Sequence, residues 1–502
     1  MSNQKDKIED LKDLESWMKS LADQVRAMAD APKYILPLIF YKRLNDVYED
    51  EFEKVSQTIT DREVAKRVAR MGGVVRFTIP DEARFEEIRK TTQNLGEKLT
   101  QALRSIAKEN PKLQGVMDIA DYNATSAGQR IISDHQISRL IEIIAQKRLG
   151  LNDVEPDLLG RAYEYLLRIY AEGSGKSAGE FYTPRTVTYL MAYLLDPEEG
   201  QEVYDPACGS GGLLIKCALV LKEKLGEELK RPLRLYGQER NYLTYAISKM
   251  NLFLHDLEGE ILMGDTFSSP RFLEKRELRR FDLVVANPMW NQDDYDERFY
   301  QQDKYNRFTF GFPPSSSADW GWIQHMLASL NQKGKMGVVL DTGAVSRGGR
   351  EKAIRQKFVE KDLIESIVLL PENLFYNTGA PGIIMIINKS KPKERKGKIM
   401  LINASQEYEK GKPKNYLEEK NIKKIKDAYH NWQEIEGLTK IITFEEAAKN
   451  DFNLSPSRYV SIGEVEEYRP IKKIQIELAE VEKEREDIEK KIKKVLGKLK
   501  KS

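Results

Sequence analysis

A short apolar run ends abruptly in a turn that carries three groups suited to holding a flat, nitrogen-containing ring. Residues 283–286 are apolar, and the tetrapeptide Asn-Pro-Met-Trp follows at 287–290. Such a run is typical of a buried strand in a parallel sheet, at whose carboxyl end ligands bind in open α/β folds. The Asn287 amide oxygen and the Pro288 carbonyl can each accept an N–H, and Trp290 offers a stacking face. The turn suits an exocyclic amino group, although proline-containing turns also end many strands that have no such role.

A second motif, rich in glycine, lies upstream. Residues 203–215 read Val-Tyr-Asp-Pro-Ala-Cys-Gly-Ser-Gly-Gly-Leu-Leu-Ile, which predicts a short strand, a glycine loop and the start of a helix. Glycine lets the backbone turn tightly and approach a ligand closely. The stretch lacks the Gly-Lys-Ser/Thr ending of a P-loop and the spacing of the dinucleotide fingerprint. It suits an adenosine with an amino-acid tail, and the alternative is a loop that only packs a helix against a strand.

Two acidic residues follow further predicted strands. Glu239 comes after the run 233–236, and Asp265 comes after the run 261–263. A carboxylate at the first position can accept both ribose hydroxyl protons, as in dinucleotide-binding folds. One at the second position can accept from an adenine amino group. Each position also suits an ordinary solvated turn, but the recurrence at successive strand ends favours a ligand site.

Together these motifs resemble those of S-adenosylmethionine-dependent amino-methyltransferases that act on DNA adenine. Their order is that of the gamma arrangement, and the chain is most similar to the modification subunit of Type I restriction–modification systems. Other stretches that match the family pattern are Ser317–Trp320, Gly337–Leu340, Arg347–Glu351 and Leu370–Phe375. The resemblance covers almost the whole chain. It implies a site-specific, adenine-specific DNA methyltransferase with a Rossmann-like S-adenosylmethionine-dependent domain.

The resemblance also assigns roles to individual residues. It makes Asn287, Pro288 and Trp290 catalytic. The residues that it implies for binding S-adenosylmethionine are Glu180, Phe181, Tyr182, Thr183, Pro184, Arg185, Asp205, Gly209, Ser210, Gly211, Gly212, Glu239 and Asp265. The family usually has proline at the position of Met289, and phenylalanine or tyrosine at the position of Trp290. Because the two hydrogen-bond acceptors come from Asn287 and Pro288, we expect the reaction type to be kept.

The expected chemistry is a direct, in-line methyl transfer. The adenine N6 lone pair is delocalised into the ring, and acceptors at positions 287 and 288 favour a more tetrahedral nitrogen, so catalysis rests on positioning and polarisation. The base must leave the duplex to be reached. The same type of tetrapeptide occurs in methyltransferases that act on RNA bases or on protein glutamine. A catalytically weak structural subunit is a further alternative.

Composition limits the class of protein. A chain of 502 residues is long enough for two or three domains. Its formal net charge of +2 argues against a strongly basic nucleic-acid binder, so a DNA-facing positive surface must be local or come from a partner. The two cysteines, Cys208 and Cys217, resemble no zinc set, and we expect no metal site. A charged start without an apolar segment, and no apolar stretch of membrane-spanning length, predict a cytoplasmic protein without a membrane segment.

Hydrophobic periodicity predicts four regions. Residues 1–170 form an N-terminal helical domain, in which Trp17 and Leu21 are among the apolar residues at helical spacing. Residues 171–400 form the methyltransferase domain, a doubly wound α/β sheet. Its predicted strands lie at the apolar runs that begin near 203, 233, 261, 283, 337, 366 and 383. Residues 401–469 are mostly helical, and residues 470–502 form a C-terminal helical, coiled-coil-like tail.

The tail bears on the partners of the chain. From Ile474 to Leu499 apolar residues follow the 4-3 spacing of a coiled-coil seam, which suits a partner helix, although docking on its own domain is the alternative. The charged, mostly helical stretch after residue 388 is too short for two target-recognition modules. We therefore expect double-stranded DNA to be recognised by another chain. The resemblance implies that this other chain is a specificity subunit, and that two copies of the present chain and a restriction subunit belong to the complete complex.

The segment 291–317 follows the proposed catalytic turn. It is long and polar, with aromatic residues at intervals. Long loops within a compact domain are usually functional or disordered. The two interpretations that fit are a lid over the extruded base and a segment that is disordered without DNA.

Overall fold

The computed structural model describes residues 11–25, 28, 31–59, 61–69, 71, 74–173, 183–376, 378–412 and 414–461, and in the tail only 478, 482, 483, 485 and 488. Three predicted cofactor contacts, Glu180, Phe181 and Tyr182, lie outside the described residues. So does the predicted seam of the tail, apart from Leu478 and Ile488.

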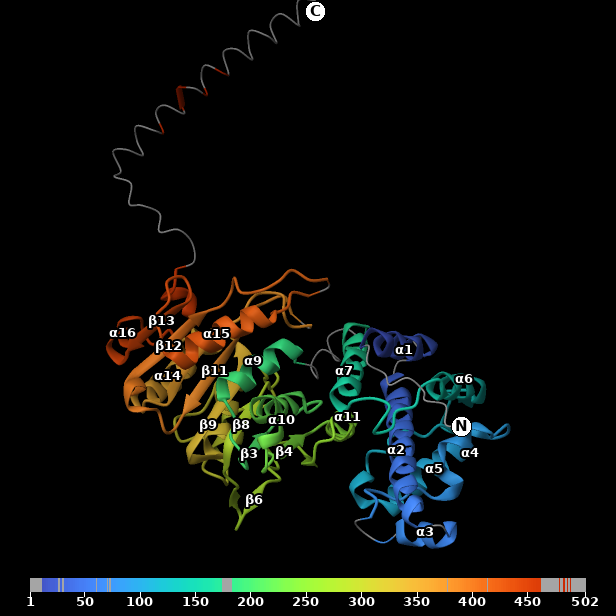
Figure 1. Ribbon diagram of the computed structural model, residues 1–502. Helices are drawn as coiled ribbons and strands as arrows, with labels where there is room; N and C mark the ends of the chain where they lie inside the picture. Colours follow the sequence, from blue (N-terminus) through green and yellow to red (C-terminus); the bar gives the residue numbers. More distant parts are fainter. Residues whose placement is uncertain are drawn as a thin grey trace, which may run out of the picture.

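Helices dominate the chain up to residue 173, on one side of the molecule (Figure 1). They are α1 (Leu11–Gln24), α2 (Ala31–Thr58), α3 (Arg62–Ala69), α4 (Phe85–Arg89), α5 (Leu95–Glu109), α6 (Asp134–Ala145) and α7 (Pro156–Gly173), with the hairpin β1 (Thr125–Ser126) and β2 (Gln129–Arg130). The long α2 is buried over most of its first five turns, and the other helices share one apolar core with it. Trp17 and Leu21 lie in this core, which confirms the predicted N-terminal all-helical region.

A nine-stranded sheet forms the other side of the molecule. Its strands are β3 (Glu202–Asp205), β4 (Arg234–Glu239), β5 (Gly259–Met263), β8 (Phe281–Ala286), β9 (Leu330–Asp341), β10 (Ile364–Leu369), β11 (Gly382–Asn388), β12 (Lys398–Asn403) and β13 (Thr439–Thr443). They lie in the order β13-β12-β10-β11-β9-β8-β3-β4-β5. The strands from β9 to β5 are parallel, whereas β11 runs antiparallel to both of its neighbours and β13 runs antiparallel to β12.

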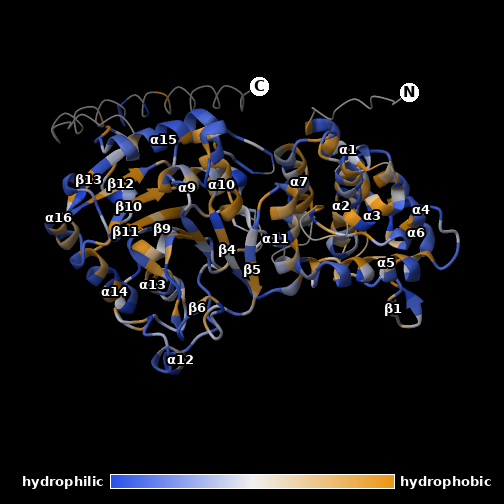
Figure 2. Ribbon diagram, turned by 60° about the horizontal axis from the view of Figure 1, so that its bottom comes forward, coloured by the Kyte–Doolittle hydropathy of each residue, from blue (hydrophilic) through white to orange (hydrophobic). Residues whose placement is uncertain are grey.

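Helices cover both faces of this sheet, as the fold-class prediction requires. One apolar layer joins the sheet to α9 (Arg185–Leu195), α10 (Gly212–Leu225) and α15 (Glu419–Asn431). The other joins it to α13 (Asp319–Ala328), α14 (Gly349–Glu360) and α16 (Phe444–Lys449). Figure 2 shows the apolar strands enclosed between these helices. Strands β10 and β11 are buried at every residue, because both faces of the sheet are covered.

The two sides of the molecule meet at α11 (Tyr242–Leu254), which follows β4. Its residues Ala246, Ile247 and Met250 belong to the apolar core of the N-terminal helices. Helix α11 also contacts both β5 and α7. The helical region is therefore packed directly against the sheet domain.

Two stretches differ in detail from expectation. The stretch 401–469 was predicted to be mostly helical; its described part, residues 401–461, contains α15 and α16 but also completes β12 and adds the edge strand β13 to the same sheet. The segment 291–317 contains α12 (Glu297–Gln301), and its Tyr295, Tyr300 and Phe308 form a small aromatic core with Phe267 and Trp322. The connection after β5 carries the short hairpin β6 (Leu273–Glu274) and β7 (Glu277–Leu278). Within the described ranges, no helix is both long and apolar enough to cross a membrane.

Candidate active site

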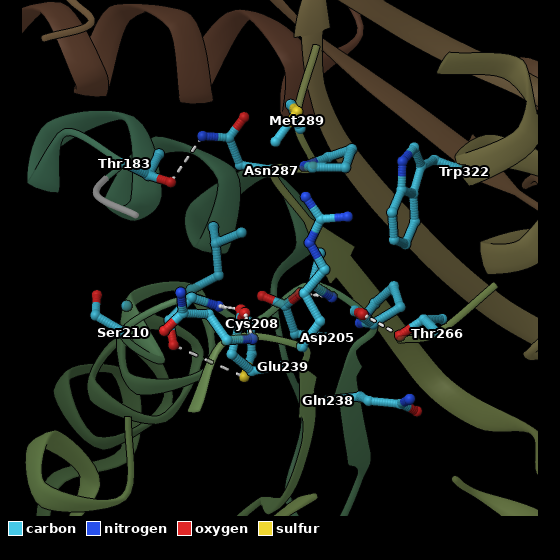
Figure 3. Close-up of a pocket in the computed structure, with 18 of the residues that line it drawn as sticks. Thr183, Asp205, Cys208, Ser210, Gln238, Glu239, Thr266, Asn287, Met289 and Trp322 are labelled. Atoms are coloured by element: carbon cyan, nitrogen blue, oxygen red, sulfur yellow. Dashed lines mark hydrogen bonds between the residues drawn. The ribbon is translucent and has the colours of Figure 1, made fainter. Parts of the chain in front are cut away.

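A pocket of about 220 Å³ opens at the carboxyl ends of the parallel strands. The chain passes from β3 outward to β4 and β5 and then returns to β8 on the other side of β3. This reversal of direction leaves a crevice beside β3, which is where open α/β sheets bind ligands. Asp205, Glu239, Asp265 and Asn287, from the ends of four strands, all line the pocket, and Figure 3 labels Asp205, Glu239 and Asn287 around it. The structure thus brings together the predicted acids and the predicted catalytic amide.

The glycine loop between β3 and α10 forms one wall of the pocket. Gly209 and Gly211 have φ angles of 53° and 80°, a region that side chains with a Cβ rarely adopt. Gly209, Ser210 and Gly212 line the pocket, whereas Gly211 shapes the turn and its N–H donates to the Cys208 carbonyl over 2.8 Å. Burial raises the pKa of the Cys208 thiol well above its usual value, which favours the neutral thiol over the thiolate.

Glu239 supports the glycine loop as well as facing the pocket. One oxygen of its carboxylate accepts the Gly209 N–H over 3.1 Å, and the other accepts the Asn241 N–H over 2.7 Å. The side chain is largely buried, and burial raises its pKa, while these backbone donors oppose the rise. The carboxylate therefore lies at a fixed position and retains lone pairs for further donors.

Asp205 is the most deeply buried acid of the pocket. Its exposed fraction is 1%, and it accepts the Ala207 N–H over 2.9 Å. Burial raises the pKa of Asp205 to about 8; the Ala207 N–H opposes this shift and the nearby Glu239 adds to it. A buried carboxyl of this kind favours a cationic ligand, which restores the stability of its charged form. The pocket therefore suits a ligand that carries both hydroxyl donors and positive charge.

The turn after β8 holds the predicted catalytic amide by both of its ends. Nδ2 of Asn287 donates to Thr183 Oγ1 over 2.8 Å, and Trp290 Nε1 donates to Asn287 Oδ1 over 3.0 Å. Figure 3 shows the first of these bonds, with Asp205 and Glu239 farther down the same pocket. Because an amide oxygen has two lone pairs, Asn287 Oδ1 can still accept one more donor.

Trp290 and Met289 lie differently from what the motif alone suggests. The Trp290 ring packs edge-on against Phe375, with 4.8 Å between ring centroids, and occupies space that a Cβ at Gly382 would need. Among the described residues that line the pocket, the turn contributes Asn287, Pro288 and Met289. Met289 is 39% exposed. The stacking of Trp290 on a substrate base stays a prediction, because in this conformation its ring faces Phe375.

The remaining predicted residues are divided between the pocket and its surroundings. Thr183 and Arg185 line the pocket, whereas Pro184 precedes α9 and faces a neighbouring cavity beside α1 and α7. Asp265 accepts the Tyr295 hydroxyl over 2.9 Å through one oxygen, and it accepts the Ser268 N–H over 2.7 Å through the other. Both oxygens of Asp265 therefore already accept hydrogen bonds within the protein, and an adenine amino group would have to share one of them.

Two aromatic residues of the pocket were missed in the sequence. Trp322 stacks on Phe267, with ring centroids 4.3 Å apart, and its indole N–H donates to Gln292 Oε1 over 3.1 Å. Tyr295 comes from the segment after the catalytic turn. Both rings offer apolar faces to a planar ligand. For Tyr295 the aromatic residues within the polar segment 291–317 were the available signal, but their spacing does not say which of them turn inward; Trp322 lies in α13, outside that segment.

A buried ion cluster lies at the floor of the pocket, between the two sides of the molecule. Glu164 of α7 accepts from Lys216 Nζ of α10 over 2.7 Å and from Arg185 over 3.3 Å. Burial opposes ionisation of Glu164, yet Lys216, His255 and Arg185 together hold its pKa below the usual value. The cluster therefore links the helical region to the helix that follows the glycine loop.

The sequence matches two family models. The one described as N-6 DNA Methylase covers residues 154–468, and the one described as HsdM N-terminal domain covers residues 14–144. The first spans the whole pocket and the sheet. The second coincides with most of the N-terminal helices.

Curated relatives and a solved structure agree with these matches. The methylase subunit of the Type I restriction enzyme MjaVII from Methanocaldococcus jannaschii is 39% identical over 486 residues, which cover 94% of this chain and 82% of that protein. The HindI methylase subunit from Haemophilus influenzae is 32% identical, over 73% of this chain and 83% of its own. A type I restriction-modification methyltransferase subunit from Streptococcus thermophilus superposes with a TM-score of 0.76 at 26% identity, covering 90% of this chain and 100% of that one.

Proposed function

This chain belongs to the N-6 DNA methylase family as a modification subunit of the Type I restriction–modification class, and we propose that it transfers a methyl group from S-adenosylmethionine to N6 of adenine in DNA. The observation that carries the proposal is the position of Asn287. Its amide is held at the end of β8 and lines the same pocket as the buried acids Asp205 and Glu239. One pocket therefore offers an acceptor for an amine beside acceptors for a cationic, hydroxyl-bearing cofactor.

The residues present fit S-adenosylmethionine. Bound there, it would supply an electrophilic methyl group on a positively charged sulfur. Glu239 would accept the ribose hydroxyls, because its carboxylate is fixed by the glycine loop at the end of β4. Asp205 would pair with the positive charge of the methionine part, which suits a buried carboxyl with a raised pKa. Trp322 and Tyr295 offer apolar faces for the adenine ring of the cofactor.

The substrate amine would meet the other end of the pocket. Asn287 Oδ1 and the Pro288 carbonyl would accept the two hydrogens on N6, which directs the nitrogen lone pair toward the methyl group. The new N–C bond forms as the C–S bond breaks, and one N6 proton is released to solvent. Since both acceptors are neutral, positioning contributes more than proton abstraction. Double-stranded DNA must present the adenine extruded from the helix.

The proposal includes the partners implied by the family. A specificity subunit would read the DNA target, a restriction subunit would complete the complex, and two copies of this chain would serve the two halves of a bipartite site. The formal net charge of +2 supports a division of labour in which another subunit supplies much of the DNA-binding surface.

The test is transfer of a radiolabelled methyl group by the complete complex, offered DNA, RNA and protein in parallel. We expect label in DNA only, recovered as N6-methyladenine after digestion. The Asn287→Ala complex should bind the cofactor normally and transfer no label, because the amine loses an acceptor. Label in RNA or protein, or full activity of the Asn287 variant, would contradict the proposal.

A further inference from the structure

Two of the stretches that match the family pattern, Ser317–Trp320 and Arg347–Glu351, do not line the pocket and meet behind the catalytic turn. Arg347, from the stretch 347–351, donates from its NH2 group to Asp319 over 2.5 Å and from Nε to Glu351 over 2.5 Å. It also pairs with Asp341, at the end of β9, over 3.3 Å. The Asp319 and Glu351 side chains are almost completely buried. A single guanidinium thus joins three carboxylates.

The same carboxylates hold the residue that directly follows the catalytic tetrapeptide. The Asn291 N–H donates to Asp319 Oδ1 over 3.0 Å, and Asn291 Nδ2 donates to Asp341 Oδ2 over 2.6 Å. Asn291 has a φ of 53°, in the left-handed region, which costs a residue with a Cβ some free energy and so needs external support. Both its backbone and its side chain receive that support from the partners of Arg347.

The next residue extends the attachment to α13. The Gln292 carbonyl accepts the Ala318 N–H over 2.8 Å, and Gln292 Oε1 accepts the Trp322 indole N–H over 3.1 Å. Gln292 and Trp322 both line the pocket. The beginning of α13 and the end of the catalytic turn are therefore bonded as one unit.

Arg347 is the group that keeps this unit together. Without its positive charge, Asp319, Asp341 and Glu351 would repel one another, and burial would favour protonation or movement of Asp319. Either change alters the acceptors of Asn291. A lysine cannot replace the arginine, because one ammonium lacks the planar fork that reaches several carboxylates.

We propose that Arg347 is a positioning residue for methyl transfer, which acts through Asp319 and Asp341 on the Asn291 end of the catalytic turn. The inference rests on the proposed function, since Asn287 lies only four residues before Asn291. A displacement of about 1 Å at a reacting group can lower a rate roughly 100-fold. Arg347 would thus influence the reaction without contacting cofactor or substrate.

The experiment compares Arg347, which lies two residues before α14, with Arg350 in the first turn of that helix, in the complete complex. Arg347→Met should lower the single-turnover methyl-transfer rate about 10- to 100-fold and weaken cofactor binding much less, because Trp322 of the same unit contacts the pocket. Arg347→Lys should recover only part of the loss. Arg350→Met is the matched control, because Arg350 lies only three residues farther along the chain, is exposed and pairs with Glu297 at the surface over 2.6 Å. The control should keep the full rate.

The outcomes separate this inference from the proposed function. A full rate in Arg347→Met, while Asn287→Ala is inactive, would overturn the inference alone. Parallel losses of rate, cofactor affinity and thermal stability in Arg347→Met would reveal a merely structural role and also overturn it. If that variant does not assemble, Asn291→Gly decides, since it removes the bond to Asp341 and glycine adopts the left-handed φ without strain; an undiminished rate there would reject the inference. Failure of the wild-type complex to methylate adenine would instead contradict the proposed function.

Discussion

Trp290 donates its indole N–H to the side-chain oxygen of Asn287 over 3.0 Å, within the same four-residue turn. An indole nitrogen can only donate, so the atom of Asn287 that faces it must be the oxygen. The Thr183 hydroxyl on the other side can either donate or accept, and here it accepts from Nδ2. Trp290 therefore fixes the orientation of the Asn287 amide. In this orientation the amide offers the substrate an acceptor rather than a donor.

Trp290→Phe tests this role, because it removes the N–H and keeps an aromatic ring. Loss of one neutral hydrogen bond should weaken transition-state stabilisation by about 0.5–1.5 kcal/mol, roughly a 2- to 12-fold lower single-turnover rate. Trp290→Ala would add a loss of about 1–3 kcal/mol if the ring also stacks on the extruded base. Fluorescence of 2-aminopurine at the target position would report that second effect. Equal rates for wild type and Trp290→Phe would contradict the orienting role.

Glu239 should contribute strongly to cofactor affinity. Glu239→Ala removes the ribose acceptor, and we expect calorimetry to show binding of S-adenosylmethionine weaker by about 1–3 kcal/mol. The same change releases the Gly209 N–H, so part of the loss would come from the glycine loop. Glu239→Gln, which keeps one acceptor oxygen, should lie between the two. Unchanged affinity in the alanine variant would reject the assignment.

Cofactor affinity should also depend on pH through Asp205. The pKa of this carboxyl is raised to about 8, so near neutral pH it is mostly protonated in the free protein. A cationic ligand favours the charged form and lowers that pKa, so binding must release a proton. Affinity should therefore rise with pH up to about 8 and then level off. Calorimetry in buffers of different ionisation enthalpy would detect the proton, and its absence would argue against a contact between Asp205 and positive charge.

Much of the sheet could be predicted from local pattern. All seven apolar runs predicted as strands, from residue 203 to residue 383, are strands in the structure. Most of them are largely buried, and strands enclosed on both faces have continuous apolar sequences, whereas the edge strand β5 buries only Ile261. Strands β12 and β13 were not predicted. The edge strand β13 is only partly buried, so its sequence, Thr-Lys-Ile-Ile-Thr, has no long apolar run. The antiparallel direction of β11 was also hidden, because an apolar run carries no sign of direction.

The sequence predicted those site residues whose chemical role requires a particular residue type at the carboxyl end of a strand. Asp205, Glu239 and Asn287 lie at carboxyl ends of neighbouring strands, and the structure gathers them in one pocket. Trp322 could not be found in this way, because nearly every residue of α13 is buried and an inward-facing aromatic is not distinguished from its neighbours. The contact of Thr183 with Asn287 joins positions 104 residues apart, and only the tertiary fold brings them together.

The ion cluster of Glu164 should be important for stability. Glu164→Ala leaves the buried Lys216 without its carboxylate, and removing one partner of a buried pair typically costs about 3–5 kcal/mol. Lys224→Ala is the control, since its pair with Asp196 is largely exposed and should contribute less than about 1 kcal/mol. Urea unfolding of the two variants would measure the difference. Similar stability of both variants would show that the cluster does not hold α7 against α10.

The same cluster predicts the response of stability to acid. The pKa of Glu164 is held below its usual value, so its stabilising effect is present above the pKa of the unfolded chain. It is lost as the pH falls through the lower, folded pKa. Wild type should therefore lose more stability on acidification than Glu164→Gln. Identical acid dependence of the two would contradict this assignment.

The tail should be required for assembly rather than for the fold of the catalytic domain. Its predicted seam, Ile474 to Leu499, is too polar to be stable as a solitary helix and suits packing on helices of a specificity subunit. Deleting the residues after Pro470 should abolish the complex and its DNA methylation, while cofactor binding and thermal unfolding of the remaining chain stay normal. The full-length chain alone should bind cofactor yet methylate DNA with little sequence preference, because its charge is nearly balanced and recognition is assigned to the partner. Co-purification of the shortened chain with its specificity subunit at undiminished affinity would refute the docking role, and efficient site-specific methylation by the full-length chain alone would refute the division of labour.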